Sequence, residues 1–161
     1  MYIQMEISMK TRMMLATLVA MVAFATSYAA DTVSLEGVKC LFNPKAAAKA
    51  EQSAEWKEGK VYFCCGNCKG KFEKMTKEDK DKMAAQSNVQ LVATKQYEQK
   101  TCPMSGGKLN AETAIEVSGV KVSFCCNNCK GKAEKMKDEE KVAELFGDKA
   151  FKNFAKVEAK K

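Results

Sequence analysis

The chain has 161 residues and carries 27 Lys and Arg against 20 Asp and Glu, a formal net charge of +7. It contains eight Cys and no His, which excludes mixed Cys/His metal sites. It also lacks a Gly-x-Ser-x-Gly motif and a Gly-rich phosphate loop, so the usual signatures of hydrolytic catalysis are missing. The lysines alternate with acidic residues at helical spacing, which argues against nucleic-acid binding. We therefore expect a binding protein rather than an enzyme.

The N-terminus has the pattern of a secretory signal peptide over residues 1–29. Lys10 and Arg12 precede an apolar run at 13–25, which is too short to span a bilayer comfortably. Small residues follow the run, and we place cleavage after Ala29. The expected location is the periplasm or the extracellular space, with no stable membrane insertion once the signal peptide is removed.

The rest of the chain contains one cysteine-rich segment twice. Residues 64–75 and 125–136 are identical at ten of twelve positions, and a single further cysteine, Cys40 or Cys102, precedes each copy. A unit of some 60 residues buries little core and usually needs a metal ion or disulfides. The predicted organisation is a first four-cysteine module at 30–85, a linker at 86–96, and a second four-cysteine module with C-terminal helices at 97–161.

In the first module, the patterns predict short strands followed by a helix that begins at a cysteine. The expected elements are a strand at 31–39, a helical turn at 45–51, a hairpin of strands at 53–57 and 60–63, a helix at 65–75 and a short helix from Thr76 to Ala85. From Cys65 onward, cysteines and apolar residues recur at the spacing of one helix face. Ser87 and Asn88 are expected to end the second helix, and 89–94 is expected to be a connecting segment that can be extended.

The second module repeats this plan. The expected elements are a strand at 97–101, a hairpin of 115–117 and 120–124 turning at Ser118-Gly119, a helix at 126–136, a helix at 138–146 ended by Gly147, and a last short helix capped by Asp148 that carries Phe151 and Phe154. The Lys-rich tail at 155–161 is expected to be frayed. The predicted fold class is α+β, with two tandem modules that each consist of a β-hairpin and a cysteine-capped helix.

The cysteine spacing predicts a thiolate metal site in each module. Cys-x-x-Cys at a helix N-terminus places two sulfurs on one side, where helix N–H groups stabilise thiolates. A hairpin can return the distant cysteine to the same point, and four thiolates match a closed tetrahedral zinc site. All-sulfur ligation favours soft or borderline ions, and we expect one Zn²⁺ or Cu⁺ per module. The candidate ligands are Cys40, Cys64, Cys65, Cys68, Cys102, Cys125, Cys126 and Cys129.

These residues resemble the TRASH and YHS group of heavy-metal-binding domains, whose pattern is Cys, about twenty residues, then Cys-x-x-x-Cys after an aromatic strand. The resemblance is carried by Cys102-Pro103-Met104-Ser105-Gly106 with Val122-Ser123-Phe124-Cys125 and Cys129, and by Cys40 with Tyr62-Phe63-Cys64 and Cys68. It implies treble-clef-like modules that bind or sense heavy metals through three core cysteines each. Cys65 and Cys126 are additional to that pattern, and their role as fourth ligands stays open.

Two other interpretations of the cysteines stay open at this point. Exported proteins meet oxidising conditions, so the chain can instead be a metal-free interaction module held together by disulfides. Cys-x-x-Cys at a helix start also occurs in thiol–disulfide oxidoreductases, although no βαβ pattern surrounds it here. For the metal-binding interpretation, the expected partners are metal ions and a metal transporter or another exported protein.

Overall fold

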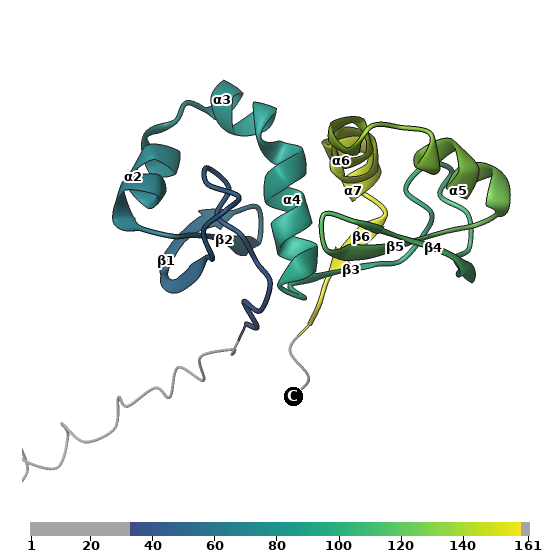
Figure 1. The fold of residues 1–161 in the computed structure, drawn as a ribbon, viewed down its shortest axis with the longest axis horizontal. Helices are drawn as coiled ribbons and strands as arrows, with labels where there is room; N and C mark the ends of the chain where they lie inside the picture. Colours follow the sequence, from purple (N-terminus) through teal and green to yellow (C-terminus); the bar gives the residue numbers. More distant parts are fainter. Residues whose placement is uncertain (1–32, 159–161) are drawn as a thin grey trace, which may run out of the picture. The chain divides into compact units, whose positions relative to one another are not determined.

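The computed structural model describes residues 33–158 (Figure 1). The predicted signal peptide at 1–29 lies outside the described residues. The first half contains β1 (Lys49–Trp56), β2 (Gly59–Phe63), α2 (Gly66–Lys74), α3 (Lys77–Lys82) and α4 (Ala84–Ala93). The second half contains β3 (Tyr97–Gln99), β4 (Asn110–Val117), β5 (Val120–Phe124), α5 (Asn127–Glu134), α6 (Asp138–Phe146), α7 (Asp148–Phe151) and β6 (Phe154–Lys156). The α+β class with small antiparallel hairpins is confirmed.

Each half contains an antiparallel hairpin that leads directly into a cysteine-capped helix. β1 pairs with β2 and β4 pairs with β5, and each first strand is irregular before the regular pairing begins. Ser118 and Gly119 both have positive φ, 50° and 78°, as a two-residue turn matched to the strand twist requires. After each hairpin the chain turns into α2 or α5, with Cys65 or Cys126 at the N-cap. The hairpin and helix expected in each module are therefore present.

The apolar face of each hairpin packs against the helix that follows it. In the first half Phe63 and Phe72 are fully buried, with ring centroids 5.3 Å apart, and Trp56 meets Phe72 edge-on at 6.1 Å. In the second half the corresponding position, Ala133, is also fully buried, in a larger core that includes Phe146 from α6. Both cores anchor the strand end from which the cysteine cluster emerges.

Helix α4 corrects the prediction for the segment between the two repeats. Ser87 and Asn88 do not end a helix, and 89–94 is not extended; Ala84–Ala93 is one helix whose buried face includes both polar residues. The Asn88 side chain accepts a hydrogen bond from the Trp56 indole N–H (2.9 Å) and donates to the carbonyl oxygen of Phe146 (2.8 Å). Tertiary hydrogen bonds thus hold Asn88 in the interior although its local propensity favours a helix end, whereas the buried Ser87 hydroxyl has no hydrogen-bond partner among the described residues.

Three further expectations were wrong. The alanine-rich segment at 45–51 is not a helical turn, because β1 begins at Lys49, and within the described part of 31–39 only Lys39 pairs, in a single bridge to Ala47. The tail does not fray at 155, since β6 pairs antiparallel with β3. Phe154 therefore lies in a strand rather than in the last helix, and its ring stacks on Phe151 at 5.4 Å.

Candidate metal centres

The structure brings together three cysteines in each half. The Sγ atoms of Cys40, Cys64 and Cys68 all lie within 4.8 Å of one another, and so do those of Cys102, Cys125 and Cys129. We call these groups the first site and the second site. In each, the first cysteine comes from a loop, the second follows the hairpin, and the third lies in the first turn of the helix. The loop cysteine is buried and the other two are half-buried.

The sulfur separations match those of a metal–thiolate polyhedron. With metal–sulfur bonds of about 2.3 Å, a tetrahedron has sulfur–sulfur edges of about 3.8 Å. The Cys64 and Cys68 sulfurs are 3.8 Å apart, and those of Cys125 and Cys129 are 3.7 Å apart. A disulfide needs about 2.05 Å, and all eight cysteines are free thiols in the structure. The residues present therefore fit a soft metal ion held by three sulfurs at each site.

Cys65 and Cys126 occupy a different position from the other candidate ligands. Neither belongs to a group of three, and both are exposed. Their sulfurs nevertheless lie beside one ligand of each site, with Cys65 3.8 Å from Cys64 and Cys126 3.7 Å from Cys125. Their backbones are extended and nearly identical, φ −159° and −160°, which places both thiols at the start of the helix in the same way.

The loop that carries the buried cysteine of each site is a tight turn closed by backbone hydrogen bonds. The Asn43 N–H donates to the Cys40 carbonyl (3.2 Å), and the Gly106 N–H donates to the Cys102 carbonyl (2.7 Å). In the second site Gly106 has φ +71°, and a Cβ added at Gly107 would lie 3.1 Å from the Cβ of Cys125. The glycines therefore let the turn approach the cysteine cluster closely.

The turn also favours the thiolate form of the buried cysteine. Burial disfavours the Cys102 thiolate, but the Ser105 hydroxyl and backbone N–H groups of Cys125 and of the turn outweigh burial and lower the Cys102 pKa to about 7. Burial likewise opposes ionisation of Cys40, and hydrogen bonds led by the Cys64 backbone N–H outweigh it and lower the Cys40 pKa. An ionised sulfur at this position is the form that binds a metal ion.

In contrast, the pKa of the helix cysteine of each site is raised, which favours its neutral thiol. Burial, followed by hydrogen bonds with the Cys65 and Cys64 thiols, raises the pKa of Cys68 to about 12. Burial and the hydrogen bond with Cys125 are the leading causes that raise the pKa of Cys129 to about 12. Sulfurs this close cannot all be anionic near neutral pH unless a cation lies among them. Metal binding at these sites would therefore displace protons.

A glutamine side chain fixes both arms of the first site. Nε2 of Gln90, in α4, donates to the carbonyl oxygens of Lys39 (2.8 Å) and Tyr62 (2.9 Å), and its Oε1 accepts from the Tyr62 N–H (2.6 Å). Lys39 directly precedes Cys40, and Tyr62 lies two residues before Cys64. One amide group thus holds the loop arm and the strand arm of the site at a fixed separation.

The second site has the same bridge, but its glutamine, Gln99, does not correspond to Gln90 in the repeat. Nε2 of Gln99, in β3, donates to the carbonyl oxygens of Thr101 (3.2 Å) and Ser123 (2.7 Å), and its Oε1 accepts from the Ser123 N–H (2.9 Å). Thr101 directly precedes Cys102, just as Lys39 directly precedes Cys40 in the first site. We call these two arrangements the glutamine bridges. Sequence reasoning missed them, because Gln90 follows its cysteine cluster whereas Gln99 precedes it.

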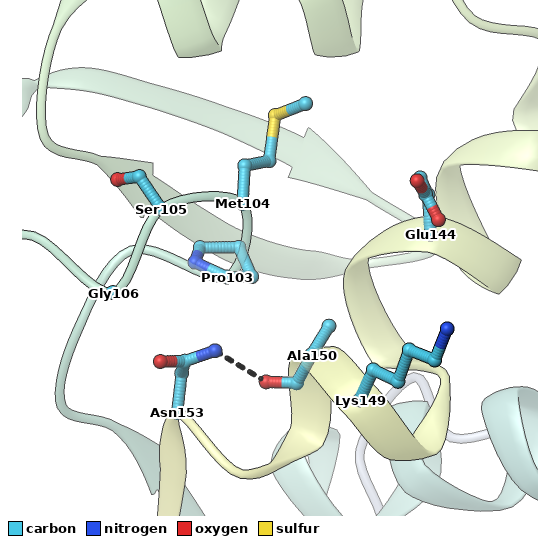
Figure 2. A pocket seen from close by; sticks show the side chains of 8 residues that line it. All are labelled: Pro103, Met104, Ser105, Gly106, Glu144, Lys149, Ala150 and Asn153. Atoms are coloured by element: carbon cyan, nitrogen blue, oxygen red, sulfur yellow. Dashed lines mark hydrogen bonds between the residues drawn. The ribbon is translucent and has the colours of Figure 1, made fainter.

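The surroundings of the two sites differ. In the first site the Phe42 ring stacks on Phe63 at 6.0 Å. In the second site the Ser105 hydroxyl lies 3.2 Å from the Cys125 sulfur, and Met104 replaces the aromatic residue. A hollow of about 370 Å³ opens beside that turn (Figure 2). It is lined by Pro103, Met104, Ser105, Gly106, Glu144, Lys149, Ala150 and Asn153.

Comparison with known protein families, curated proteins and solved structures finds no match to this chain. Across residues 33–158, no helix is long and apolar enough to cross a membrane. The two cysteine sites are therefore the structural basis for any assignment of function.

Proposed function

We propose that the chain is an exported metal-binding protein that holds one soft or borderline ion, Zn²⁺ or Cu⁺, at each of its two sites through cysteine thiolates. The observation that carries the proposal is the convergence of three sulfurs at each site, within 4.8 Å of one another. The ligand set contains no carboxylate or carbonyl oxygen of the kind that Mg²⁺ or Ca²⁺ requires, which favours soft ions.

The way each site is built supports a binding role. A buried loop cysteine, a cysteine at a strand end and a cysteine in a helix turn come from three different local structures, and the arrangement occurs twice. The sulfur separations of 3.8 and 3.7 Å in the two sites are those that ligands of one metal ion have. The resemblance of the cysteine spacing to TRASH and YHS domains favours heavy-metal binding or sensing, with a metal transporter or another exported protein as the partner.

Titration with Cd²⁺ tests the proposal, because cadmium–thiolate bonds absorb in the ultraviolet and Cd²⁺ prefers the same sulfur ligands. The reduced protein should reach its endpoint at two equivalents of Cd²⁺. Cys40→Ser and Cys102→Ser should each reach it at one equivalent, since each removes the buried ligand of one site. A wild-type protein that shows no charge-transfer band, or variants that bind as many ions as the wild type, would contradict the proposal.

A further inference from the structure

The sulfurs of Cys65 and Cys126 do not belong to the two groups of three sulfurs, although each lies beside one sulfur of a group. Each sulfur lies 3.7–3.8 Å from the sulfur of the preceding cysteine, which is about the edge of a metal–thiolate tetrahedron. Both are exposed, whereas the cysteines of the two sites are buried or half-buried. A closed structural site would enclose its fourth ligand with the other three.

The same geometry appears in both halves of the chain. The N-cap residues Cys65 and Cys126 share φ and ψ to within about a degree, −159°, 166° and −160°, 167°. The same sequence, Asn-Cys-Lys-Gly-Lys, starts two residues after each N-cap, at Asn67 and at Asn128. In both halves, the exposed sulfur thus lies beside one ligand of the site and at the solvent surface. That position suits a ligand that binds the ion transiently.

We infer that Cys65 and Cys126 are exchange ligands, through which a thiolate-bearing partner delivers the ion to each three-cysteine site or takes it away. The inference rests on the proposed metal binding, with the ion as cargo. An ion held by three thiolates keeps an open coordination position. The exposed thiolate can fill that position while another ligand is released, without a change in the helix backbone.

The transfer conserves charge and bonds. During release, a metal–sulfur bond to Cys65 forms as one to a resident cysteine breaks, and a bond to the partner's thiolate then forms as the next resident bond breaks. The ion keeps its oxidation state throughout. Each thiol that becomes a ligand gives its proton to water, and each thiolate that is released takes one up. The partner is therefore a molecule that presents one or more accessible thiolates.

Alkylation of the metal-loaded full-length chain tests the position of these thiols. The Cd²⁺-loaded protein is treated with iodoacetamide, and the modified cysteines are identified by peptide mass spectrometry. Cys65 and Cys126 should be modified, while the six cysteines of the two sites stay protected. Protection of all eight would show closed four-sulfur sites and would overturn the inference.

Transfer kinetics test the role. Release of Cd²⁺ to a dithiol chelator is monitored by native mass spectrometry of the protein at timed intervals, in the wild type and in the Cys65→Ser/Cys126→Ser variant. The variant should still bind two ions but release them about tenfold more slowly. Cys65→Ser alone should slow release from one site only, which gives two kinetic phases. An unchanged rate, or the loss of an ion from the double variant, would refute exchange. Failure of the wild type to bind Cd²⁺ at all would instead refute the proposed function.

Discussion

The glutamine bridge of the first site offers a sharp test of how the fold positions its ligands. Gln90→Met keeps the length and volume of the side chain but removes all three hydrogen bonds, at 2.6, 2.8 and 2.9 Å, to the backbone beside Cys40 and Cys64. Gln90 is 4% exposed, so water cannot readily replace the lost partners. At about 1 kcal/mol per hydrogen bond, the expected loss of stability is about 3 kcal/mol.

The same substitution should weaken metal binding at the first site. Residues that orient metal ligands without touching the ion typically contribute about 10–100-fold to metal affinity. The affinity is measured by competition with a chromophoric chelator in the Cys102→Ser background, in which only the first site binds. Gln90→Met should lower the affinity of that site by about this factor. Gln99→Met in the Cys40→Ser background should have the same effect on the second site.

The crossed pairs separate positioning from general destabilisation. Gln90→Met in the Cys40→Ser background leaves only the second site, whose bridge is intact, and its affinity should be nearly unchanged. Gln99→Met in the Cys102→Ser background is the reciprocal control. If each substitution weakens both sites equally, or neither, then the bridges do not position the ligands and the reasoning is wrong.

Three other substitutions and one treatment have expected outcomes. Asn88→Ala removes the acceptor of the Trp56 indole and a donor to α6, and should lower the free energy of unfolding by about 2–4 kcal/mol in urea titrations; a loss below about 0.5 kcal/mol would contradict the interior role of α4. Gly107→Ala crowds Cys125 and should lower the free energy of unfolding by about 1–2 kcal/mol. Gly131 lies in a helix, and a Cβ added there meets nothing within 4 Å, so Gly131→Ala should raise the free energy of unfolding by about 0.5–1 kcal/mol. Thermal melts of the two variants compare these effects. Chelation of the bound ion should unfold most of the chain, as folding of small thiolate modules is coupled to metal binding, and circular dichroism that does not change in chelator would exclude this.

Sequence reasoning found the parts of the structure that local patterns encode. The Thr76 cap is one case: its side chain accepts from the Asp79 N–H, as the residues at 76–79 predict. Helix α6 also has the predicted limits, Asp138–Phe146. The convergence of Cys40 with its partners could be predicted because the repeat links one loop cysteine to each cluster.

Other features depend on contacts between distant segments and could not be predicted from local patterns. Asn88 lies inside a helix because its amide bonds to Trp56 and to the Phe146 backbone, residues 32 and 58 positions away. The glutamine bridges were missed for the same reason, since a side-chain amide that pairs with a strand edge leaves no periodic signal. The different places of Cys65 and Cys68 around the first site also follow from the geometry at the helix start, which spacing alone does not specify.

Native mass spectrometry of the full-length reduced protein, loaded with Zn²⁺ and desalted, tests the central claim most directly. We predict a dominant species that carries two ions, and the recovery of eight alkylatable thiols once the ions are removed by acid. A dominant species without ions, with thiols lost in pairs, would show that the cysteines form disulfides rather than metal sites.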